Sequence, residues 1–387
     1  MVPRICEKLL KRYARGFRAV AIAGPRQSGK TILVRNTFPD KPYISLENPD
    51  ERLMAENDAR TFLSRFPKGA IIDEIQRAPA LFSYLQQILD ETKRDGLFIL
   101  TGSNNFLLQE SLTQTLAGRA GYIDLLPLSY SEIELFGKKQ RTTDSLMLLG
   151  AYPEIYHRKR KPAEWYPAYI RTFVERDVKQ FRNVGDTILF QRFMQLCAGR
   201  TGQLLNVASI SNECDIDVKT VNAWLGLLQA AYIIHLLPPY HKSFNKRIVK
   251  TPKLYFIDTG LACNLLGIRT PLELSNSHFR GSLFENLVVT ELLKKKFNSG
   301  SPSRLYFWRD NKGLEVDVLW DSGKQIVPIE IKSSRTLQPD HMRYMKRWNK
   351  ISGSKQGILV YDGDQEFLGS DGIKVVNWKK IGELELK

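Results

Sequence analysis

A glycine-rich segment that ends in a Lys-Thr pair constrains the fold of this chain more than any other feature. Residues 19–38 read AVAIAGPRQSGKTILVRNTF, and Gly24, Gly29, Lys30 and Thr31 fit the spacing G-x-x-x-x-G-K-[ST]. The residues before the first glycine are apolar, as in a buried parallel strand, and the residues after the Lys-Thr pair give a helix an apolar face. The segment therefore predicts an α/β fold in which a phosphate-binding loop joins a strand to a helix.

The predicted loop is suited to hold a nucleoside triphosphate. A curled glycine-rich backbone and a helix N-terminus both present N–H groups to phosphate oxygens. Lys30 is expected to reach the β- and γ-phosphates, and Thr31 is expected to ligate magnesium. An ordinary glycine turn is the alternative. We predict ATP and Mg2+ as cofactors, bound by Gly24, Pro25, Arg26, Gln27, Ser28, Gly29, Lys30 and Thr31.

Two further segments supply polar residues at the ends of predicted strands. Residues 69–77 read GAIIDEIQR, so that Asp73 is expected to hold magnesium and Glu74 to polarise the attacking water. A strand that runs into an acidic turn would look similar. Residues 97–105 read LFILTGSNN and end in polar side chains, one of which could sense the γ-phosphate: Thr101, Ser103 and Asn104.

Composition limits the class of protein. The 57 Lys and Arg residues exceed the 41 Asp and Glu residues by 16, and residues 131–280 are the most basic third. Such a surface can contact nucleic acid or an acidic partner, although scattered lysines also serve ordinary solvation. No apolar run approaches the ~18 residues of a membrane span, and the first 17 residues read as a basic amphipathic helix. We therefore expect a soluble, cytoplasmic protein with free thiols at Cys6, Cys197, Cys214 and Cys263.

Taken together, these segments resemble a known family. AIAGPRQSGKT, IIDEIQRAPALFSYLQQILD, FILTGSNNFLL and LAGRAGYIDLLPLSYSE resemble the AAA-type prokaryotic ATPases whose C-terminal half is a domain of unknown function, DUF4143. The resemblance covers essentially the whole chain and includes FIDTGL, FENLVVTEL, YFWRD and PIEIKSS. It implies a doubly wound sheet and an arginine that contacts the γ-phosphate of the same or a neighbouring subunit. Arg119 in LAGRAG is the candidate, with Arg171 and Arg176 as rivals, and a solvated arginine is the alternative.

The pattern divides the chain into an ATPase core at 1–130, a helical lid at 131–185, a winged helix-turn-helix module at 186–253 and a C-terminal domain at 254–387. In the third part, three helical patterns precede two strand-like segments. Val218, Val221, Leu225 and Leu228 repeat at helical spacing and leave outward positions that can meet a DNA groove, at Lys219, Thr220 and Asn222. A protein-contact or intramolecular switch module is the rival interpretation.

The C-terminal third carries acidic residues at informative positions. Glu285 lies on a predicted amphipathic helix, and Asp317 lies in the second strand of a predicted hairpin. Glu330 and Lys332 share one face of the strand VPIEIKSS, because they are two residues apart. This order resembles the PD-(D/E)xK nucleases of the restriction-endonuclease fold. In that family two acids ligate a divalent metal, the lysine positions water and the upstream acid completes the metal shell. An ordinary amphipathic edge strand with its charges outward, or a structural ion pair with Lys332, is the alternative.

We therefore predict an ATPase that acts on nucleic acid, with the ATP state gating a metal-dependent nuclease-like domain, and with a homo-oligomer as a further expectation. The catalytic residues would be Glu74, Arg119, Ser103 and Lys332, and the metal ligands would be Thr31, Asp73, Glu285, Asp317 and Glu330. The leading alternative is an ATP-driven switch whose C-terminal fold is inert and binds a partner. A loader or initiator of the AAA type on DNA is the third interpretation.

Overall fold

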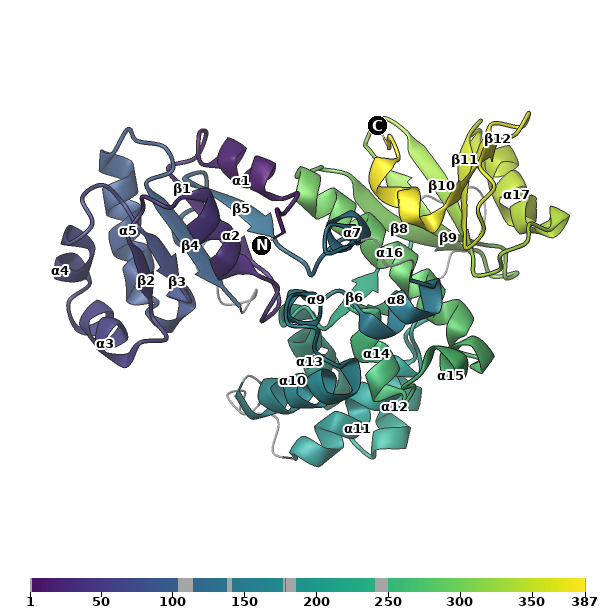
Figure 1. Ribbon diagram of the computed structural model, residues 1–387, viewed down its shortest axis with the longest axis horizontal. Coiled ribbons are helices and arrows are strands. Elements are labelled where there is room, and N and C mark those ends of the chain that lie inside the picture. The colour runs from purple at the N-terminus through teal and green to yellow at the C-terminus, as the bar shows by residue number, and fades with distance from the viewer. Residues whose placement is uncertain are drawn as a thin grey trace. The chain divides into compact units, whose positions relative to one another are not determined.

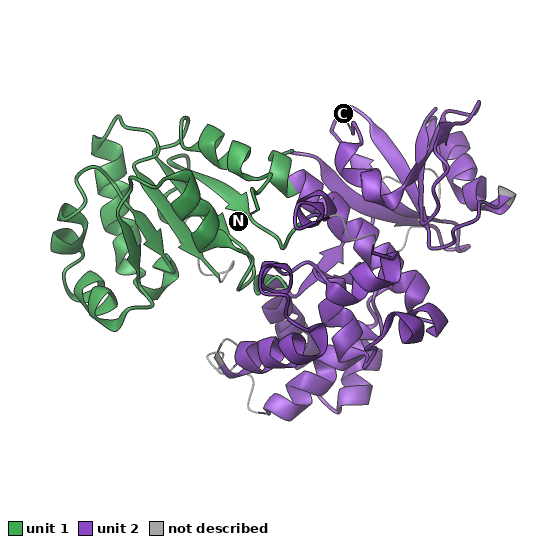
Figure 2. Cartoon of the chain, in the orientation of Figure 1, with its two compact units in different colours: residues 1–128, 230–232, 297–301 green, residues 129–229, 233–296, 302–387 purple. Residues whose placement is uncertain are grey.

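The computed structural model describes residues 2–103, 114–137, 141–176, 178, 186–240 and 250–386. The chain forms two compact units (Figure 2). The N-terminal unit is Met1–Leu128 with Ala230–Tyr232 and Phe297–Ser301, and the C-terminal unit is Ser129–Gln229, Ile233–Lys296 and Pro302–Lys387. Within the described ranges, no helix combines the length and the apolar character that crossing a membrane requires.

The N-terminal unit is built on a five-stranded sheet of order β2-β3-β4-β1-β5 in which every neighbouring pair is parallel (Figure 1). Parallel neighbours need crossover connections, and helices supply most of them here. The strands are β1 Ala19–Ala23, β2 Tyr43–Ser45, β3 Ile71–Asp73, β4 Phe98–Gly102 and β5 Ala120–Asp124. The helices are α1 Glu7–Tyr13, α2 Lys30–Thr37, α3 Pro49–Asn57, α4 Ala59–Ser64 and α5 Ala80–Glu91, with the short 3-10 helix η1 Ile75–Arg77.

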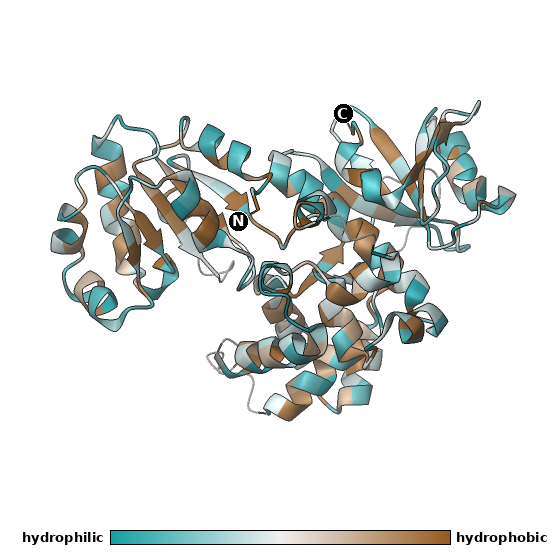
Figure 3. Cartoon of the chain, in the orientation of Figure 1, coloured by the Kyte–Doolittle hydropathy of each residue, from teal (hydrophilic) through white to brown (hydrophobic). Residues whose placement is uncertain are grey.

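Burial of both sheet faces explains the apolar composition of these strands (Figure 3). All residues of β1 are buried, and Val20 packs with Ile71, Ile99 and Ile123 of the neighbouring strands. The predicted α/β fold is therefore confirmed. The N-terminal helix is shorter than the 17 residues expected, because only Glu7–Tyr13 is helical.

The helical part of the C-terminal unit contains the segments predicted as lid and three-helix module. Its helices are α7 Tyr130–Glu134, α8 Thr143–Leu149, α9 Pro153–His157, α10 Pro162–Arg176, α11 Thr187–Ala198, α12 Val207–Cys214, α13 Val218–Ala230, α14 Thr259–Leu265 and α15 Pro271–Asn276. Strands β6 Ile234–Leu237 and β7 Lys253–Phe256 pair antiparallel. Val218 is 48% exposed instead of buried, because α13 begins there, one turn before the buried Val221 and two turns before the buried Leu225.

A six-stranded sheet forms the rest of the C-terminal unit, in the order β12-β13-β11-β10-β9-β8. The predicted hairpin is present, since β8 and β9 are antiparallel, while β10, β11 and β13 run parallel. The strands are β8 Arg304–Arg309, β9 Glu315–Asp321, β10 Ile326–Lys332, β11 Gly357–Tyr361, β12 Phe367–Leu368 and β13 Ile373–Asn377. The helices are α16 Arg280–Ser299 and α17 Arg343–Ser352, with the 3-10 helices η3 Pro339–Met342 and η4 Trp378–Glu383.

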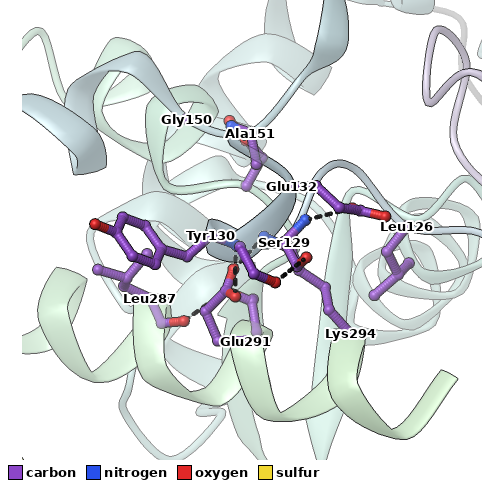
Figure 4. Close-up of polar contacts among 12 residues, drawn as sticks. Leu126, Ser129, Tyr130, Glu132, Gly150, Ala151, Leu287, Glu291 and Lys294 are labelled. Carbon is purple, nitrogen blue, oxygen red and sulfur yellow. Dashed lines mark hydrogen bonds and ion pairs between the residues drawn. The ribbon is translucent and has the colours of Figure 1, made fainter. Parts of the chain in front are cut away.

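The first helix of the C-terminal unit is held on α16 by buried polar contacts (Figure 4). The backbone N–H of Tyr130 donates to Glu291 at 2.9 Å, and Lys294 Nζ donates to the other oxygen of Glu291 at 2.7 Å. Glu132 caps α7 by accepting from the Ser129 N–H at 2.8 Å. The side chains of Glu291 and Lys294 are only 7% and 3% exposed, so a buried ion pair on α16 holds the carboxylate that accepts from the start of α7.

Candidate functional site

The predicted phosphate-binding loop joins β1 to α2, as the sequence indicates. Gly29 directly precedes α2 with a φ of 95°, which is a left-handed conformation that glycine adopts without strain. A Cβ at Gly24 would lie 2.2 Å from the Leu125 carbonyl oxygen, so only glycine fits there. Both glycines are therefore required by the local backbone, independently of any ligand.

Lys30 is folded into this loop. Its side chain donates to the carbonyl oxygens of Gly24 and Pro25, each at 2.8 Å, and the residue is only 5% exposed. Ser28 Oγ is also buried, and it has no hydrogen-bond partner among the described residues. The loop thus holds a buried positive charge next to an unsatisfied polar group.

Asp73 is the centre of a hydrogen-bond network at the end of β3. Its Oδ2 accepts from Thr31 Oγ1 at 3.0 Å and from the Tyr43 hydroxyl at 2.6 Å, while Oδ1 accepts from Thr101 Oγ1. Burial and the bond to Asp73 raise the pKa of Tyr43, so its hydroxyl stays a neutral donor. The network brings together α2, β2, β3 and β4. Tyr43 and Thr101 were not assigned to this carboxylate from the sequence.

Glu74 lies in a strained conformation beside the network. Its φ of 56° is left-handed, which costs a residue with a side chain about 1 kcal/mol or more. The turned backbone directs its carboxylate to Ser103, whose hydroxyl donates at 2.9 Å, and to Gln76, whose amide donates at 2.5 Å. Ser103 therefore contacts Glu74, while Asn104 lies outside the described residues.

The two candidate arginines whose side chains the structure describes are engaged elsewhere. Arg119 forms a two-pronged pair with Asp90 on α5, at 2.5 and 2.9 Å. Arg171 pairs with Glu175 at 2.9 Å on the surface of α10. The side chain of Arg176 lies outside the described part of the chain. In this conformation both described arginines thus have acidic partners of their own.

The C-terminal unit brings together the predicted acidic residues and their lysine. Val318 of β9 lies opposite Ile329 of β10, so Asp317 and Glu330 occupy the next position of the two strands. Lys332 Nζ donates to Glu330 Oε1 at 2.7 Å, whereas Glu330 Oε2 is buried and has no hydrogen-bond partner in the part of the chain that the structure describes. Burial and the nearby Asp317 raise the pKa of Glu330 to about 8, although Lys332 acts in the opposite direction.

A second lysine, missed by the sequence analysis, lies in the same cluster. Lys253 of β7 is 3% exposed, and its Nζ lies 3.0 Å from Glu285 Oε1 and 2.5 Å from Glu315 Oε1. The Tyr255 hydroxyl also donates to Glu285, at 2.5 Å. Alternation places Lys253 and Tyr255 on one face of β7, and Glu315 and Asp317 on one face of β9, and the sequence could have shown this much. It could not have shown that Lys253 pairs with Glu315 across the fold.

The described residues include no group of three or more His, Cys, Asp or Glu side chains placed to hold a metal ion. Glu285, expected to complete a metal shell, is instead tied to Lys253 and Tyr255. Asp317 accepts from the Ile331 N–H at 2.8 Å. In the conformation described, Lys253 and Lys332 therefore neutralise the carboxylates of this cluster.

The predicted DNA-facing positions of α13 are accessible but locally bonded. Lys219 is exposed, Thr220 donates to Asp217 at 2.6 Å, and Asn222 donates to the Val218 carbonyl at 2.9 Å. Three further basic residues of the predicted winged-helix segment lie outside the described residues, namely Lys242, Lys246 and Arg247.

Comparison with known families matches three segments of this chain. Residues 16–134 match an AAA domain, residues 280–381 match the domain of unknown function DUF4143, and residues 140–272 match a further domain of unknown function, DUF8612. The first match contains the loop and the Asp73 network. The second contains Glu285, Asp317, Glu330 and Lys332.

Uncharacterised proteins from several bacteria are similar over nearly the whole length. One from Mycobacterium tuberculosis is 30% identical over 372 residues, which cover 95% of this chain and 81% of that protein. One from Haemophilus influenzae is 24% identical over 394 residues, which cover 92% of this chain and 93% of that protein. Among solved structures, a Walker-type ATPase of Pyrococcus abyssi aligns with a TM-score of 0.46 and 15% identity, covering 67% of this chain and 94% of that one.

Proposed function

Because this chain belongs to the family of AAA-type ATPases that carry a DUF4143 domain, we propose that its N-terminal unit binds and hydrolyses ATP with the residues around Lys30 and Asp73. The observation that carries the proposal is the 3.0 Å bond between Thr31 Oγ1 and Asp73 Oδ2. It places a hydroxyl and a carboxylate oxygen side by side at the end of a phosphate-binding loop, and hard cations such as Mg2+ prefer such oxygen ligands.

The loop fits a triphosphate on several grounds. The buried ammonium of Lys30 needs only to exchange two loop carbonyls for phosphate oxygens. Ser28 Oγ supports the same interpretation, because a buried hydroxyl without a partner is costly unless a ligand satisfies it. Magnesium, held by Thr31 and Asp73, would supply charge neutralisation at the phosphates. Tyr43 and Thr101 would keep Asp73 oriented toward that position.

Glu74 is the proposed residue that orients water. A carboxylate at this place accepts a proton or a hydrogen bond from the attacking water, and Ser103 and Gln76 hold it in position. The strained φ of Glu74 supports this role, because backbone strain of this kind concentrates at functional sites. Arg119 remains the proposed γ-phosphate contact, which requires release of its pair with Asp90.

The experiment is ATP turnover by purified protein with two variants. Lys30→Ala should abolish tight binding of MgATP, because it removes the charge matched to the phosphates. Glu74→Gln should bind ATP and hydrolyse it at least about 100-fold more slowly, since general-base catalysis typically contributes that much. Ser64→Ala, in an exposed helix end of the same unit, is the control. Turnover by Glu74→Gln equal to that of the parent protein would remove Glu74 from the mechanism.

For the C-terminal unit we propose a restriction-endonuclease-like domain that acts on nucleic acid under control of the ATP state. Its support is the unpartnered, buried Glu330 Oε2 next to Asp317 and Lys332. Asp317 and Glu330 would hold a divalent cation, and Lys332 would position water for phosphodiester hydrolysis. The three helices α11 to α13, followed by the hairpin β6-β7, support a winged-helix module that contacts DNA.

A second function is favoured by a different observation. Because Lys253 already neutralises Glu285, that carboxylate is engaged in an ion pair, and across the described ranges no three His, Cys, Asp or Glu side chains are placed to hold a metal. This supports a switch driven by ATP, in which the C-terminal fold binds a partner and catalyses nothing. Incubation with single- and double-stranded DNA and RNA, with Mg2+ or Mn2+ and with or without ATP, separates the two functions. Cleavage that Asp317→Ala abolishes without affecting ATP turnover supports the nuclease, and no cleavage under any condition supports the switch.

A further inference from the structure

The connection between β10 and β11 concentrates positive charge next to the proposed catalytic carboxylates. Residues 332–356 contain seven Lys or Arg residues and a single acid, Asp340. In the rest of 281–387 the balance is reversed, with 11 basic and 13 acidic residues. A net charge of this size within 25 residues is an electrostatic footprint for a polyanion.

Helix α17 arranges this charge in a single stripe. Arg343, Lys346, Arg347 and Lys350 are exposed and follow the spacing i, i+3, i+4, i+7, which places them on one face of a helix. Lys346 pairs with an acid, Asp371, at 2.9 Å. Within the described residues, the other three basic side chains have no acidic partner. The stripe is thus a largely uncompensated row of charges about 10 Å long.

The opposite face of α17 is buried in the protein core. Met345 and Trp348 are fully buried, and Trp348 packs edge-on against Trp308 at 5.0 Å between ring centroids. An amphipathic helix that lies on a membrane must insert its apolar face into the bilayer. The apolar face of α17 is unavailable for that purpose, so the basic stripe is not a membrane anchor.

The stripe begins near the end of β10 that carries Glu330 and Lys332. Strand β10 packs against both η3 and α17. Figure 1 shows α17 beside the strands of the C-terminal sheet. Burial and the nearby Lys332 lower the pKa of His341, which lies in η3 just before Arg343. The carboxyl ends of parallel strands are the usual place for ligands in open sheets, and the stripe starts at that edge.

We propose that the exposed basic face of α17 binds the phosphate backbone of a nucleic acid and leads it to Glu330 and Lys332. This inference rests on the proposed action of the C-terminal unit on nucleic acid. The cations lie along one helical face over about 10 Å, and a nucleic acid presents a negative charge at every phosphate along such a length, whereas an acidic peptide does not. Tyr344, 41% exposed at the flank of the stripe, adds a ring on which an unpaired base can stack.

The test is salt-dependent binding of a fluorescent DNA duplex of about 30 base pairs, followed by anisotropy between about 0.05 and 0.3 M salt. The variant is Arg343→Gln, Arg347→Gln and Lys350→Gln combined. Each lost phosphate contact lowers the slope of log K against log salt by about 0.9, so we expect a loss of about 2 to 3 in slope and about tenfold or more in affinity. The matched control is Arg60→Gln, Lys68→Gln and Lys93→Gln, which removes three exposed charges from the N-terminal unit.

The outcomes separate this inference from the proposed function. A changed slope in the α17 variant alone, with ATP turnover and thermal stability retained, supports the inference. Three results overturn it: equal losses in both variants, an unchanged slope in the α17 variant, or tighter binding of the protein to vesicles of anionic lipid than to DNA. None of these results removes the DNA binding of the parent protein. If the parent protein binds neither DNA nor RNA, the nucleic-acid part of the proposed function fails together with the inference. The proposed ATP hydrolysis is tested separately, by the turnover assay.

Discussion

Replacing Lys253 by Met is expected to destabilise the C-terminal unit strongly. The change keeps the length of the side chain and removes a charge that is 3% exposed and lies 3.0 Å from Glu285 and 2.5 Å from Glu315. Removing one partner of a buried ion pair typically costs about 3 to 5 kcal/mol, because the remaining charge stays buried without compensation. For a unit of this size, that loss corresponds to a fall in Tm of about 6 to 20 °C.

Tryptophan fluorescence measures this loss selectively, because all six tryptophans lie in the C-terminal unit. The control is the double variant Lys253→Met with Glu285→Gln, which removes both charges of the pair. We expect it to recover at least half of the lost stability, since Glu315 keeps Arg309 as a partner at 3.2 Å. A double variant less stable than Lys253→Met alone would refute the argument that the unpaired charge causes the loss.

Three further predictions follow from single contacts. Tyr43→Phe removes a donor to Asp73, and we expect magnesium-dependent ATP binding to weaken by about 10- to 100-fold in a titration, since such outer contacts typically contribute that much. Burial and a nearby lysine lower the pKa of His235 to about 4, so stability that is present above pH 6.5 is lost as pH falls toward 4. His235 as a residue is half-buried. We therefore expect urea unfolding to show that the parent protein loses about 1 to 2 kcal/mol more stability between pH 7.5 and pH 5 than His235→Gln loses. Tyr166→Phe removes a 2.6 Å bond to buried Asp258, and calorimetry should show a loss of about 2 kcal/mol.

The residues of the proposed nucleotide site could largely be picked out from the sequence, because its parts are local. The loop from Gly24 to Thr31 has a fixed spacing, and Asp73 follows an apolar strand, so each is recognisable within ten residues. Tyr43 and Thr101 could not be found in this way. They reach Asp73 only because β2 and β4 flank β3 in the sheet, and single-sequence patterns do not specify strand order.

The carboxylate cluster shows the same limit. Alternation placed Glu330 and Lys332 on one face of a strand, and the hairpin placed Asp317 beside them, since both inferences need only neighbouring segments. Lys253 is 62 residues from Glu315 along the chain, and no periodicity connects a strand of the helical module with the six-stranded sheet. Its burial between two acids is a consequence of tertiary packing.

The two functions proposed for the C-terminal unit differ in the role that they give to Lys253. In a metal-dependent centre, an ammonium 3.0 Å from Glu285 competes with a divalent cation for that carboxylate. Lys253→Met should then bind Mn2+ more tightly than the parent protein, and Mn2+ should restore part of its lost stability, because a ligand that binds the folded state stabilises it. In an ion-pair cluster the lysine is itself the required cation, so the variant loses stability that Mn2+ does not restore. Calorimetric titration of the variant with Mn2+, repeated on the form that also carries Asp317→Ala, therefore separates a centre that a metal can occupy from one that it cannot.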